Sequence, residues 1–444
     1  MSSRAPVILT KFRNLGEQMK KIVKMSLVAA VAVAGLTTAN AKPLEEAIKD
    51  VDVSGTVVYR YNDAKTKNTG AASTHGQTNN YKIGLNLSSK VNDDVKLNTR
   101  FIVGDADLGF ASLNSATTAD GSVGVELSNV YFGYTGIKNT TVNVGKQGLT
   151  TPWTVAIDSD GNEQTGTGIL ALSTWGPVTV AAAYFNQTNL DSSGTYTSVD
   201  HDNNGATANI NALNTLSGNG TNAGAKDVVT LGAIANVGPV TVDAWYLDMA
   251  DIFDTYTLGA KAGFDVSGVQ LGADVRYTSL SFDTNAAVGA VNATNDDHDM
   301  LKLELSAKAG IVDALYRFAK TDKEGGIVTL DNDATTTTQG WSVRADGKND
   351  ASYHQFVLGV QAMDNLHVSA NYVTVEYEGV ALQGSTAAAT NKNEDTEIYA
   401  QVVYNMSKNL MTYVRFGQEE RKDKIAGTKA EDDYKGRLQI QYSF

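Results

Sequence analysis

The sequence contains no cysteine and only 5 prolines among its 444 residues. The absence of cysteine excludes a disulfide scaffold, thiol catalysis and cysteine-ligated zinc. With 42% hydrophobic and 19% charged residues, the composition is not that of collagen, a long coiled coil or a disordered chain. Positive charge is also scarce: 36 Lys and Arg stand against 49 Asp and Glu, giving a net charge of -13. A nucleic-acid partner would therefore meet mostly repulsion, and none is expected.

Long apolar runs are missing after residue 41, so no later segment reaches the roughly 18 apolar residues that a membrane-spanning helix needs. Near the start, three lysines precede an apolar stretch over residues 25–36, and the triplet Ala39-Asn40-Ala41 follows. A basic region, a short apolar region and a small-residue cleavage site are typical of a secretory signal peptide. We therefore predict a signal peptide over residues 19–41 and Sec-type export.

Residues 1–18 fit no part of such a signal. We predict that they are a mis-called start and that Met19 is the true first residue. Cleavage after Ala41 would leave residues 42–50 as a short periplasmic segment. The folded part of the chain is then expected to cover residues 51–444.

What the sequence has in place of long apolar runs is alternation of apolar and polar residues. At the C-terminus, Leu438, Ile440, Tyr442 and Phe444 share one face, and the intervening polar residues share the other. This period of two indicates β-strands with one apolar face. It predicts 18 strands, with 16 as the competing count because several are weakly patterned and one slips in phase between Leu127 and Val130. The expected strands are 51–61, 81–88, 95–103, 125–134, 140–146, 168–174, 178–185, 228–236, 240–247, 256–262, 269–277, 300–308, 312–319, 353–362, 368–376, 396–404, 410–417 and 434–444.

The connections between these strands alternate strictly between long and short. The short ones carry turn residues, as in Trp175-Gly176-Pro177 and Val237-Gly238-Pro239. Short turns at one end and long loops at the other are typical of an up-and-down barrel in the outer membrane of a Gram-negative bacterium. Strands can cross a membrane only as a closed barrel, because unpaired edge amides are costly in hydrocarbon. The sequence therefore predicts an all-β, antiparallel transmembrane β-barrel, in contact with outer-membrane lipid and lipopolysaccharide.

Tyrosines recur on the apolar faces where the outward-running strands are expected to end. They are Tyr59, Tyr61, Tyr184, Tyr246, Tyr277, Tyr316 and Tyr372. We interpret them as an aromatic girdle at the outer headgroup level. The competing interpretation is that tyrosine simply favours strand ends.

The polar faces of the strands carry charge, which indicates a water-filled interior. A barrel of about 18 strands encloses a lumen too wide for side chains to fill. The charged residues expected to face inward are Arg60, Lys82, Lys96, Arg100, Asp243, Lys261, Asp274, Arg276, Lys302, Glu304, Arg317, Glu397, Arg415 and Arg437. Some inward positions, such as Trp245, Leu315 and Val357, are apolar, and a plug or packed loop is expected to cover them. The pattern favours a porin, a channel for passive diffusion of ions and small hydrophilic solutes.

The third long connection, residues 147–167, has three carboxylates and no basic residue. The carboxylates are Asp158, Asp160 and Glu163. If this connection folds into the lumen as a constriction, it faces a basic wall made of Arg60, Lys82, Lys96, Arg100 and Arg437. Opposed charges across a narrow channel sort solutes by charge.

Acidic residues also predominate in the other long connections. An acidic vestibule raises the local cation concentration within a Debye length of ~8 to 10 Å, which predicts a mild cation preference. The alternative is that these carboxylates only solvate the surface or bridge divalent ions to lipopolysaccharide.

Two segments carry a resemblance to a known family. PLEEAIKDVDVSG from Pro43 to Gly55, followed by Tyr59-Arg60-Tyr61, resembles the mature N-terminus of the campylobacterial major outer membrane porins. VGKQGLTTPWT from Val144 to Thr154 is similar to the segment by which these porins enter their inward loop. The resemblance implies a trimeric general-diffusion porin of about 18 strands, with the inward loop lining the eyelet. Members of the family are also linked to adhesion through their outer loops.

The last strand has a further expected role. Leu438, Ile440, Tyr442 and Phe444 look like the recognition strand of the outer-membrane assembly machinery, consistent with strand addition by an incoming edge. The simpler interpretation is that these residues merely face lipid, and both can hold.

Metal binding and catalysis have little support. The segment from Asp200 to Gly205 fits the first half of a calcium loop, with Asp200, Asp202 and Asn204 as its oxygen ligands, but its twelfth position is Asn211 rather than a bidentate Glu. Calcium is thus the only cofactor for which the sequence contains a candidate binding motif. No phosphate loop or nucleophile elbow is present, so no catalytic residue is expected. The alternatives to a porin are an outer-membrane adhesin with a plugged pore and an outer-membrane barrel hydrolase.

Overall fold

The computed structural model describes most of the region expected to fold. The described residues are 51–68, 72–104, 109–113, 124–190, 223–283, 287–288, 291–292, 297–323, 326, 328–378, 392–425 and 428–444. The expected signal peptide, the segment over residues 42–50 and the calcium motif at Asp200, Asp202 and Asn204 lie outside them. Within the described residues, no helix is long and apolar enough to cross a membrane.

The structure is one antiparallel sheet of 18 long strands, which confirms the expected fold class and excludes the count of 16. The long strands are β1 (Val51–Asn68), β2 (Thr74–Lys90), β3 (Val95–Val103), β5 (Val125–Ile137), β6 (Thr140–Gly148), β7 (Thr165–Trp175), β8 (Val178–Thr188), β9 (Val228–Val237), β10 (Val240–Met249), β11 (Phe253–Val266), β12 (Val269–Phe282), β15 (Asp297–Ala309), β16 (Val312–Thr321), β17 (Asn349–Met363), β18 (Leu366–Glu378), β19 (Lys392–Asn405), β20 (Leu410–Asp423) and β21 (Thr428–Ser443). The two-residue strands are β4 (Ala111–Ser112), which pairs with β2, and β13 (Ala287–Val288) with β14 (Val291–Asn292). A short 3-10 turn, η2, covers Ala223–Ala225.

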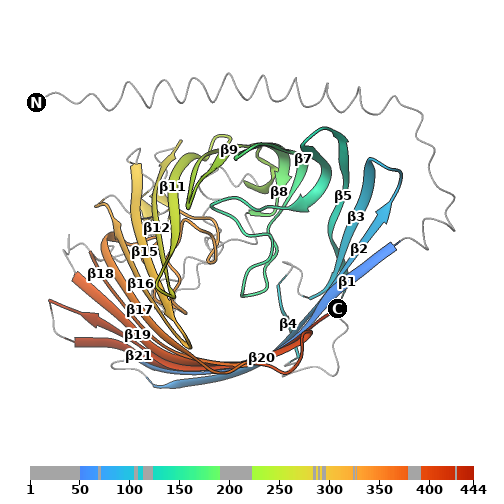
Figure 1. The fold of residues 1–444 in the computed structure, drawn as a ribbon. Coiled ribbons are helices and arrows are strands. Elements are labelled where there is room, and N and C mark those ends of the chain that lie inside the picture. Colours follow the sequence, from blue (N-terminus) through green and yellow to red (C-terminus); the bar gives the residue numbers. More distant parts are fainter. Residues whose placement is uncertain are drawn as a thin grey trace, which may run out of the picture.

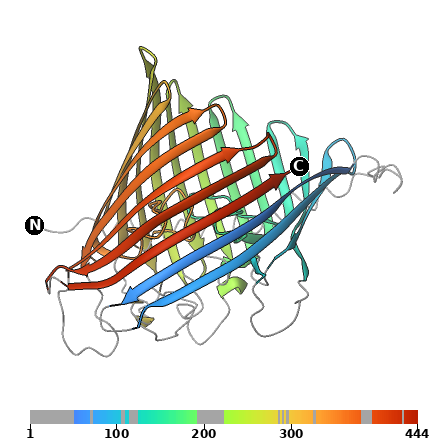
Figure 2. The same cartoon turned by 90° about the horizontal axis from the view of Figure 1, so that it is seen from below.

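The sheet closes on itself, because β1 pairs with β21 as well as with β2. The closing register runs from the pair Thr56 and Ser443 to the pair Asn68 and Glu431. Phe444 extends it, since its backbone N–H and C=O both bond to Gly55, at 3.0 and 2.9 Å. Figure 1 looks into the resulting ring, and Figure 2 shows the strands tilted across the wall. Closure leaves neither terminal strand with an unpaired edge in hydrocarbon.

At the turn end of the barrel the expected hairpins are present. Gly176, Gly238 and Gly310 lie in three of these turns with φ of 59°, 61° and 58°. Glycine adopts this left-handed backbone without steric cost, which suits the two-residue turns of antiparallel hairpins. The turns at Gly176 and Gly238, which open the near-repeat GPVTV, therefore share one geometry.

At the opposite end the strands are longer than expected. Only residues 250–252 connect β10 to β11, where the sequence predicts a connection over residues 248–255, and β21 starts at Thr428 rather than at 434. In these extensions polar residues lie on both faces, as in Gln418 to Asp423 of β20. Alternation is lost where neither face meets hydrocarbon, although the backbone pairing continues. The period of two therefore marks the membrane-embedded part of each strand rather than its whole length.

The register fixes which side chains face inward. All the charged residues expected inside lie on one face, as shown by the pairs Arg276 with Lys302, Glu304 with Arg317, and Arg415 with Arg437. The tyrosines of the expected girdle lie on the other face. There Tyr256 lies 6.1 Å from Tyr277, and Tyr316 lies 4.9 Å from Phe356, between ring centroids.

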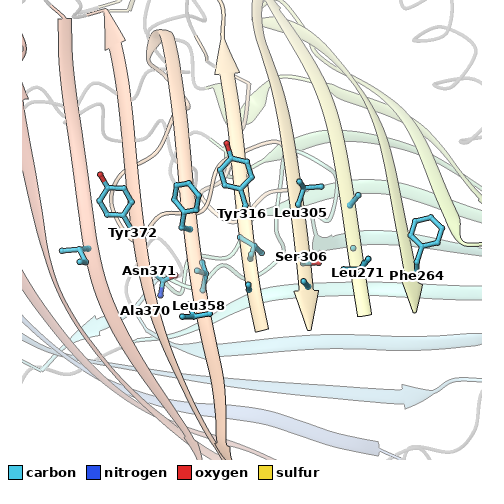
Figure 3. A pocket seen from close by; sticks show the side chains of 17 residues that line it. Phe264, Leu271, Leu305, Ser306, Tyr316, Leu358, Ala370, Asn371 and Tyr372 are labelled. Carbon is cyan, nitrogen blue, oxygen red and sulfur yellow. The ribbon is translucent and has the colours of Figure 1, made fainter. Parts of the chain in front are cut away.

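The outward face also has an apolar depression of about 800 Å³ across β11, β12 and β15 to β19. Figure 3 shows Tyr316, Tyr372 and Leu305 along it, with small residues such as Ala370 below them. Small side chains beside large ones account for the hollow, because the strand backbone is thinly covered there.

The phase slip between Leu127 and Val130 is a β-bulge. Arg100 of β3 pairs with Asn129 of β5, whereas the next residue, Phe101, pairs with Leu127. Ser128 is therefore the extra residue of the bulge. It is fully buried, and its hydroxyl donates to Glu163. The bulge thus lets β5 direct both Ser128 and Asn129 toward the interior.

Candidate functional site

Two loops fold into the barrel, the β6–β7 loop (residues 149–164) and the β16–β17 loop (residues 322–348), and Figure 1 shows both on the inner side of the strands. They pack against each other. The backbone N–H of Leu330 donates to the Trp153 carbonyl at 3.0 Å, and Thr336 donates in the same way to Pro152 at 3.1 Å. The Gln164 side chain donates to the Leu330 carbonyl at 2.9 Å. The sequence pointed to the first loop only.

The two loops rest on an apolar cluster at one side of the inner wall. Trp153 and Leu149 of the β6–β7 loop and Leu330 of the β16–β17 loop are buried there. The wall contributes Ala183, Phe185, Val228, Leu247, Met249, Phe253, Leu280 and Phe282, from β8 to β12, with Trp245 packed against them. The expectation that packed loops cover inward apolar residues holds for Trp245. Leu315 and Val357 belong to neither of the two apolar clusters in the described residues.

Glu163 is the buried anchor of the β6–β7 loop. Its side chain is 1% exposed, and its carboxylate accepts from the Arg100 guanidinium at 2.7 and 2.9 Å and pairs with the Lys82 ammonium at 2.7 Å. Burial alone raises the pKa of Glu163, but Arg100 and Lys82 outweigh it and hold that pKa below its usual value. A buried charge with two cations and a hydroxyl around it is fully compensated, so Glu163 fastens the loop to β2, β3 and β5.

Asp160 lies at the open side of the same loop. Its side chain is 39% exposed, and one oxygen faces the Arg60 and Arg437 guanidiniums at 3.2 and 3.3 Å. Burial raises its pKa, but Arg437, Arg60 and Arg344 together lower that pKa below its usual value. The carboxylate is therefore held in its ionised form.

Asp158 has a different role from the other two carboxylates. It accepts from the Asn162 backbone N–H at 2.7 Å and from the Asn162 side-chain amide at 2.8 Å, which closes the tip of the loop on itself. Burial, with smaller contributions from Asp160 and Asp333, raises the pKa of Asp158 to about 6. Asp158 makes no ion pair with the basic wall among the described residues.

Four of the five residues of the expected basic wall meet the loop. Arg60 and Arg437 reach Asp160, whereas Lys82 and Arg100 reach Glu163. Arg60 also donates to the Ser159 carbonyl, and its guanidinium lies 4.2 Å from the Phe110 ring centroid. Lys96 shares the inward face but is exposed beside the turn that joins β2 to β3, and it makes no ion pair with any described residue. The loop does not extend that far along the wall.

The β16–β17 loop is held by both backbone and side-chain groups. Lys348 pairs with Asp395 at 3.2 Å, and the Lys435 ammonium donates to the Ser342 hydroxyl at 2.8 Å. Glu397 of β19 accepts from the N–H groups of Trp341 and Ser342 at 2.8 and 2.9 Å. The Lys302 ammonium donates to the carbonyls of Thr335 and Thr337. Sequence analysis missed this loop, because its backbone contacts leave no residue signature and the side chains that it meets, such as Asp395 and Lys435, are distant in the sequence. The available signal was the inward apolar surface of Tyr353, Val373 and Val375, which the loop covers.

Two carboxylates of the β16–β17 loop, Asp331 and Asp333, lie where the two loops meet. Asp333 accepts from the Ser159 backbone N–H, and Asp331 accepts from the Asp333 backbone N–H at 2.8 Å. Asp331 is 1% exposed, and its second oxygen has no hydrogen-bond partner in the described structure. Burial, then the nearby charges of Asp158 and Asp333, raises the pKa of Asp331 to about 7.

The described residues contain no group of three or more His, Asp or Glu side chains placed to hold a metal ion. On β21, Leu438, Ile440 and Tyr442 face outward, and the Tyr442 and Phe444 rings stack at 5.8 Å. Their part in recognition by the assembly machinery stays a prediction.

Comparison with known proteins gives a family and a fold. The family model described as Campylobacter major outer membrane protein matches residues 19–444. Among solved structures, Pseudomonas aeruginosa OpdL is 14% identical with a TM-score of 0.66, covering 89% of this chain and 99% of its own. Acinetobacter baumannii OccAB3 is 12% identical with a TM-score of 0.66, at the same coverage of 89% and 99%. A BenF-like porin from Pseudomonas fluorescens Pf-5 is 14% identical with a TM-score of 0.65, again covering 89% and 99%. No curated protein sequence matches the chain.

Proposed function

Because this chain belongs to the Campylobacter major outer membrane protein family, we propose that it forms a water-filled channel for passive diffusion of ions and small hydrophilic solutes. It is a porin-like β-barrel of the outer membrane, and its fold is that of the Opd and Occ channels. The observation that carries the proposal is the charged inner wall beside two loops that are fastened inside the barrel. Charge on an inner wall is stable where an opposite charge pairs with it, as at Glu163, or where the side chain remains partly exposed, as at Asp160.

The β6–β7 loop is the constriction in this proposal. Its Glu163 carboxylate is neutralised by Arg100 and Lys82 and holds the loop in place, whereas Asp160, beside Arg60 and Arg437, is the partly exposed carboxylate that acts on passing ions in this proposal. The β16–β17 loop supports the first loop from the other side and narrows the lumen further.

A mild cation preference is the finer part of the proposal. It is supported by the excess of acidic residues in the long connections, because an acidic vestibule enriches cations near the mouth of a channel. Asp160, which is ionised and open to the lumen, continues this preference into the eyelet.

The assembly and the route to the membrane complete the proposal. Sec-type export through residues 19–41, recognition of the C-terminal strand ending at Phe444, and a homotrimer in outer-membrane lipid and lipopolysaccharide are all in keeping with the family. Cross-linking of the detergent-extracted protein tests the trimer, and recovery of the monomer alone would reject it.

The decisive experiment is conductance of the purified protein in a planar bilayer. A porin gives steady ohmic steps, and under a KCl gradient its reversal potential has the sign of K⁺ selectivity. Repeating the measurement with salts of slower cations or slower anions separates the two ionic currents. Absence of steps would favour the plugged adhesin, and a reversal potential of the opposite sign would reject the cation preference. Release of label from phospholipid or peptide by the same preparation would favour the hydrolase.

A further inference from the structure

Two arginines face each other in register on the inner wall. Arg415 of β20 and Arg437 of β21 are direct cross-strand partners, and like charges in this position repel each other. The Arg437 Nε donates to the Asn62 side chain at 2.8 Å, and its Nη1 lies 3.3 Å from Asp160. The Arg415 Nε donates to the neutral Gln401 side chain at 2.7 Å, and Arg415 has no carboxylate partner among the described residues.

Other arginines of the inner wall are neutralised locally. Arg276 pairs with Asp243 at 2.7 Å, and Arg317 pairs with Glu304 at 2.6 Å. By contrast, Asp160 alone lies beside Arg437 and is shared with Arg60. At the level of Arg60, Arg415 and Arg437, this part of the wall therefore has three guanidiniums and one neighbouring carboxylate, Asp160.

A further guanidinium comes from the β16–β17 loop. Arg344 lies near enough to Asp160 to help lower the pKa of that carboxyl group. Its Nη1 is buried and has no hydrogen-bond partner in the described structure. Because this atom is buried, Arg344 adds positive charge near Asp160 without offering the unpaired N–H groups to a solute in the lumen.

An aromatic surface lies next to these cations. The Trp341 ring centroid is 5.0 Å from the Arg415 guanidinium carbon and 5.8 Å from that of Arg437, and Tyr399 meets Trp341 edge-on at 5.7 Å. Cation–π contact holds a guanidinium in place and still leaves its N–H groups free to donate. Because Glu397 fixes the backbone at Trp341, the ring has a defined position in the lumen.

We propose that Arg415, Arg437 and Trp341 form a binding subsite in the channel for small organic monocarboxylates with a flat apolar body. The guanidinium forks match the two oxygens of a carboxylate, and the indole provides a surface for the apolar body. Inorganic phosphate would meet the cations but would leave the aromatic surface unused. The subsite rests on the proposed function, because the solute reaches it only through an open lumen.

The test uses the full-length protein in a planar bilayer, with benzoate as the probe. Ohmic conductance in KCl is recorded first, and benzoate is then titrated to find the concentration that gives half-maximal block. Benzoate should block at lower concentration than inorganic phosphate, and benzylamine, with the same ring and the opposite charge, should not block. Arg415→Gln should raise the half-blocking benzoate concentration by about tenfold, the usual worth of one charge-assisted hydrogen-bonded pair.

Two further variants and a control assign the effect to the subsite. Trp341→Leu should weaken benzoate block by about threefold and leave phosphate unchanged, because it removes only the stacking surface. Arg415→Lys keeps the charge and loses the fork, so it should lie between native and Arg415→Gln, and it serves if Arg415→Gln fails to insert. Lys308→Gln removes one inward positive charge near the turn end of β15 and should leave benzoate block unchanged.

The possible failures are distinguishable. A channel that conducts KCl normally but responds to benzoate as weakly as to benzylamine would overturn the subsite and leave the porin intact. Equal losses in Arg415→Gln and Lys308→Gln would also overturn it, since general lumen charge would then explain the block. A preparation of native protein without ohmic steps would reject the proposed function and the subsite with it.

Discussion

Glu163 and Asp160 lie three residues apart on one loop, and both face arginines, yet their surroundings differ. The Glu163 side chain is 1% exposed and meets Arg100, Lys82 and Ser128, whereas the Asp160 side chain is 39% exposed and makes two longer contacts with Arg60 and Arg437. Burial makes the first carboxylate a structural anchor, because its partners cannot be replaced by water. Exposure leaves the second free to act on passing ions, since water screens its pairs.

The largest expected effect comes from breaking the anchor. Glu163→Gln leaves Arg100 and Lys82 buried without their counter-charge, so the barrel should lose about 3–5 kcal/mol of stability. Urea unfolding in detergent, followed by tryptophan fluorescence and by gel mobility, measures this loss. Asp160→Asn is the matched control and should cost less than about 1 kcal/mol, as is usual for exposed pairs. Equal losses for the two variants would remove the distinction between anchor and exposed carboxylate.

The second expected effect is on ion selectivity, where the substitution at Asp160 should matter more than the one at Glu163. Asp160→Asn should lower the ratio of cation to anion permeability by about twofold, because it removes an ionised group from the open lumen. The reversal potential under a salt gradient reports the change. A Glu163→Gln channel that remained folded would alter this ratio less, since the Glu163 charge is neutralised by its neighbours. An unchanged reversal potential in Asp160→Asn would contradict the assignment of this residue to the constriction.

A third effect concerns the carboxylates where the loops meet. Asp158 and Asp331 have pKa values raised to about 6 and about 7, so the folded state favours their protonated forms. Stabilisation from a raised carboxyl pKa is fully present below the unfolded value and is lost as the pH rises through the folded one. Contact between the loops should therefore be firmest near pH 4 and weaken up to about pH 7. Single-channel current noise should increase over this pH range in the native protein and stay constant in the double variant Asp158→Asn, Asp331→Asn. An equal increase in both proteins would contradict the assignment of the pH dependence to these two carboxyl groups.

The smallest effect is expected at Lys96, the basic residue that the loop does not reach. Lys96→Gln should change stability by less than about 0.5 kcal/mol, because the side chain is exposed and makes no ion pair with a described residue. The same unfolding assay used for Glu163→Gln measures it. A loss as large as that of Glu163→Gln would show that the loop contacts the wall over a longer stretch than the structure describes.

The sequence was informative where membrane physics imposes a period. All 18 strands lie where alternation predicts them, and even the phase slip at Ser128 corresponds to a bulge in β5. The outer extensions of the strands, such as Thr428 to Asp433 of β21, escaped prediction, because polar residues on both faces carry no period. The β16–β17 loop also escaped prediction, because several of its anchors use backbone N–H and C=O groups that every residue possesses and the partners of the others are distant in the sequence.

By itself the sequence determined the barrel, the inward charges and the presence of acidic residues in the β6–β7 loop, since each follows from residue type and a spacing of two. Only the tertiary structure decided that Glu163 is sealed against Arg100, that Asp160 is open to the lumen and that Asp158 closes its own loop. The physical reason is that the sequence gives the residue type of a carboxylate but not its surroundings. Its free energy depends on how much water surrounds it, and that depends on the depth at which the folded loop places it.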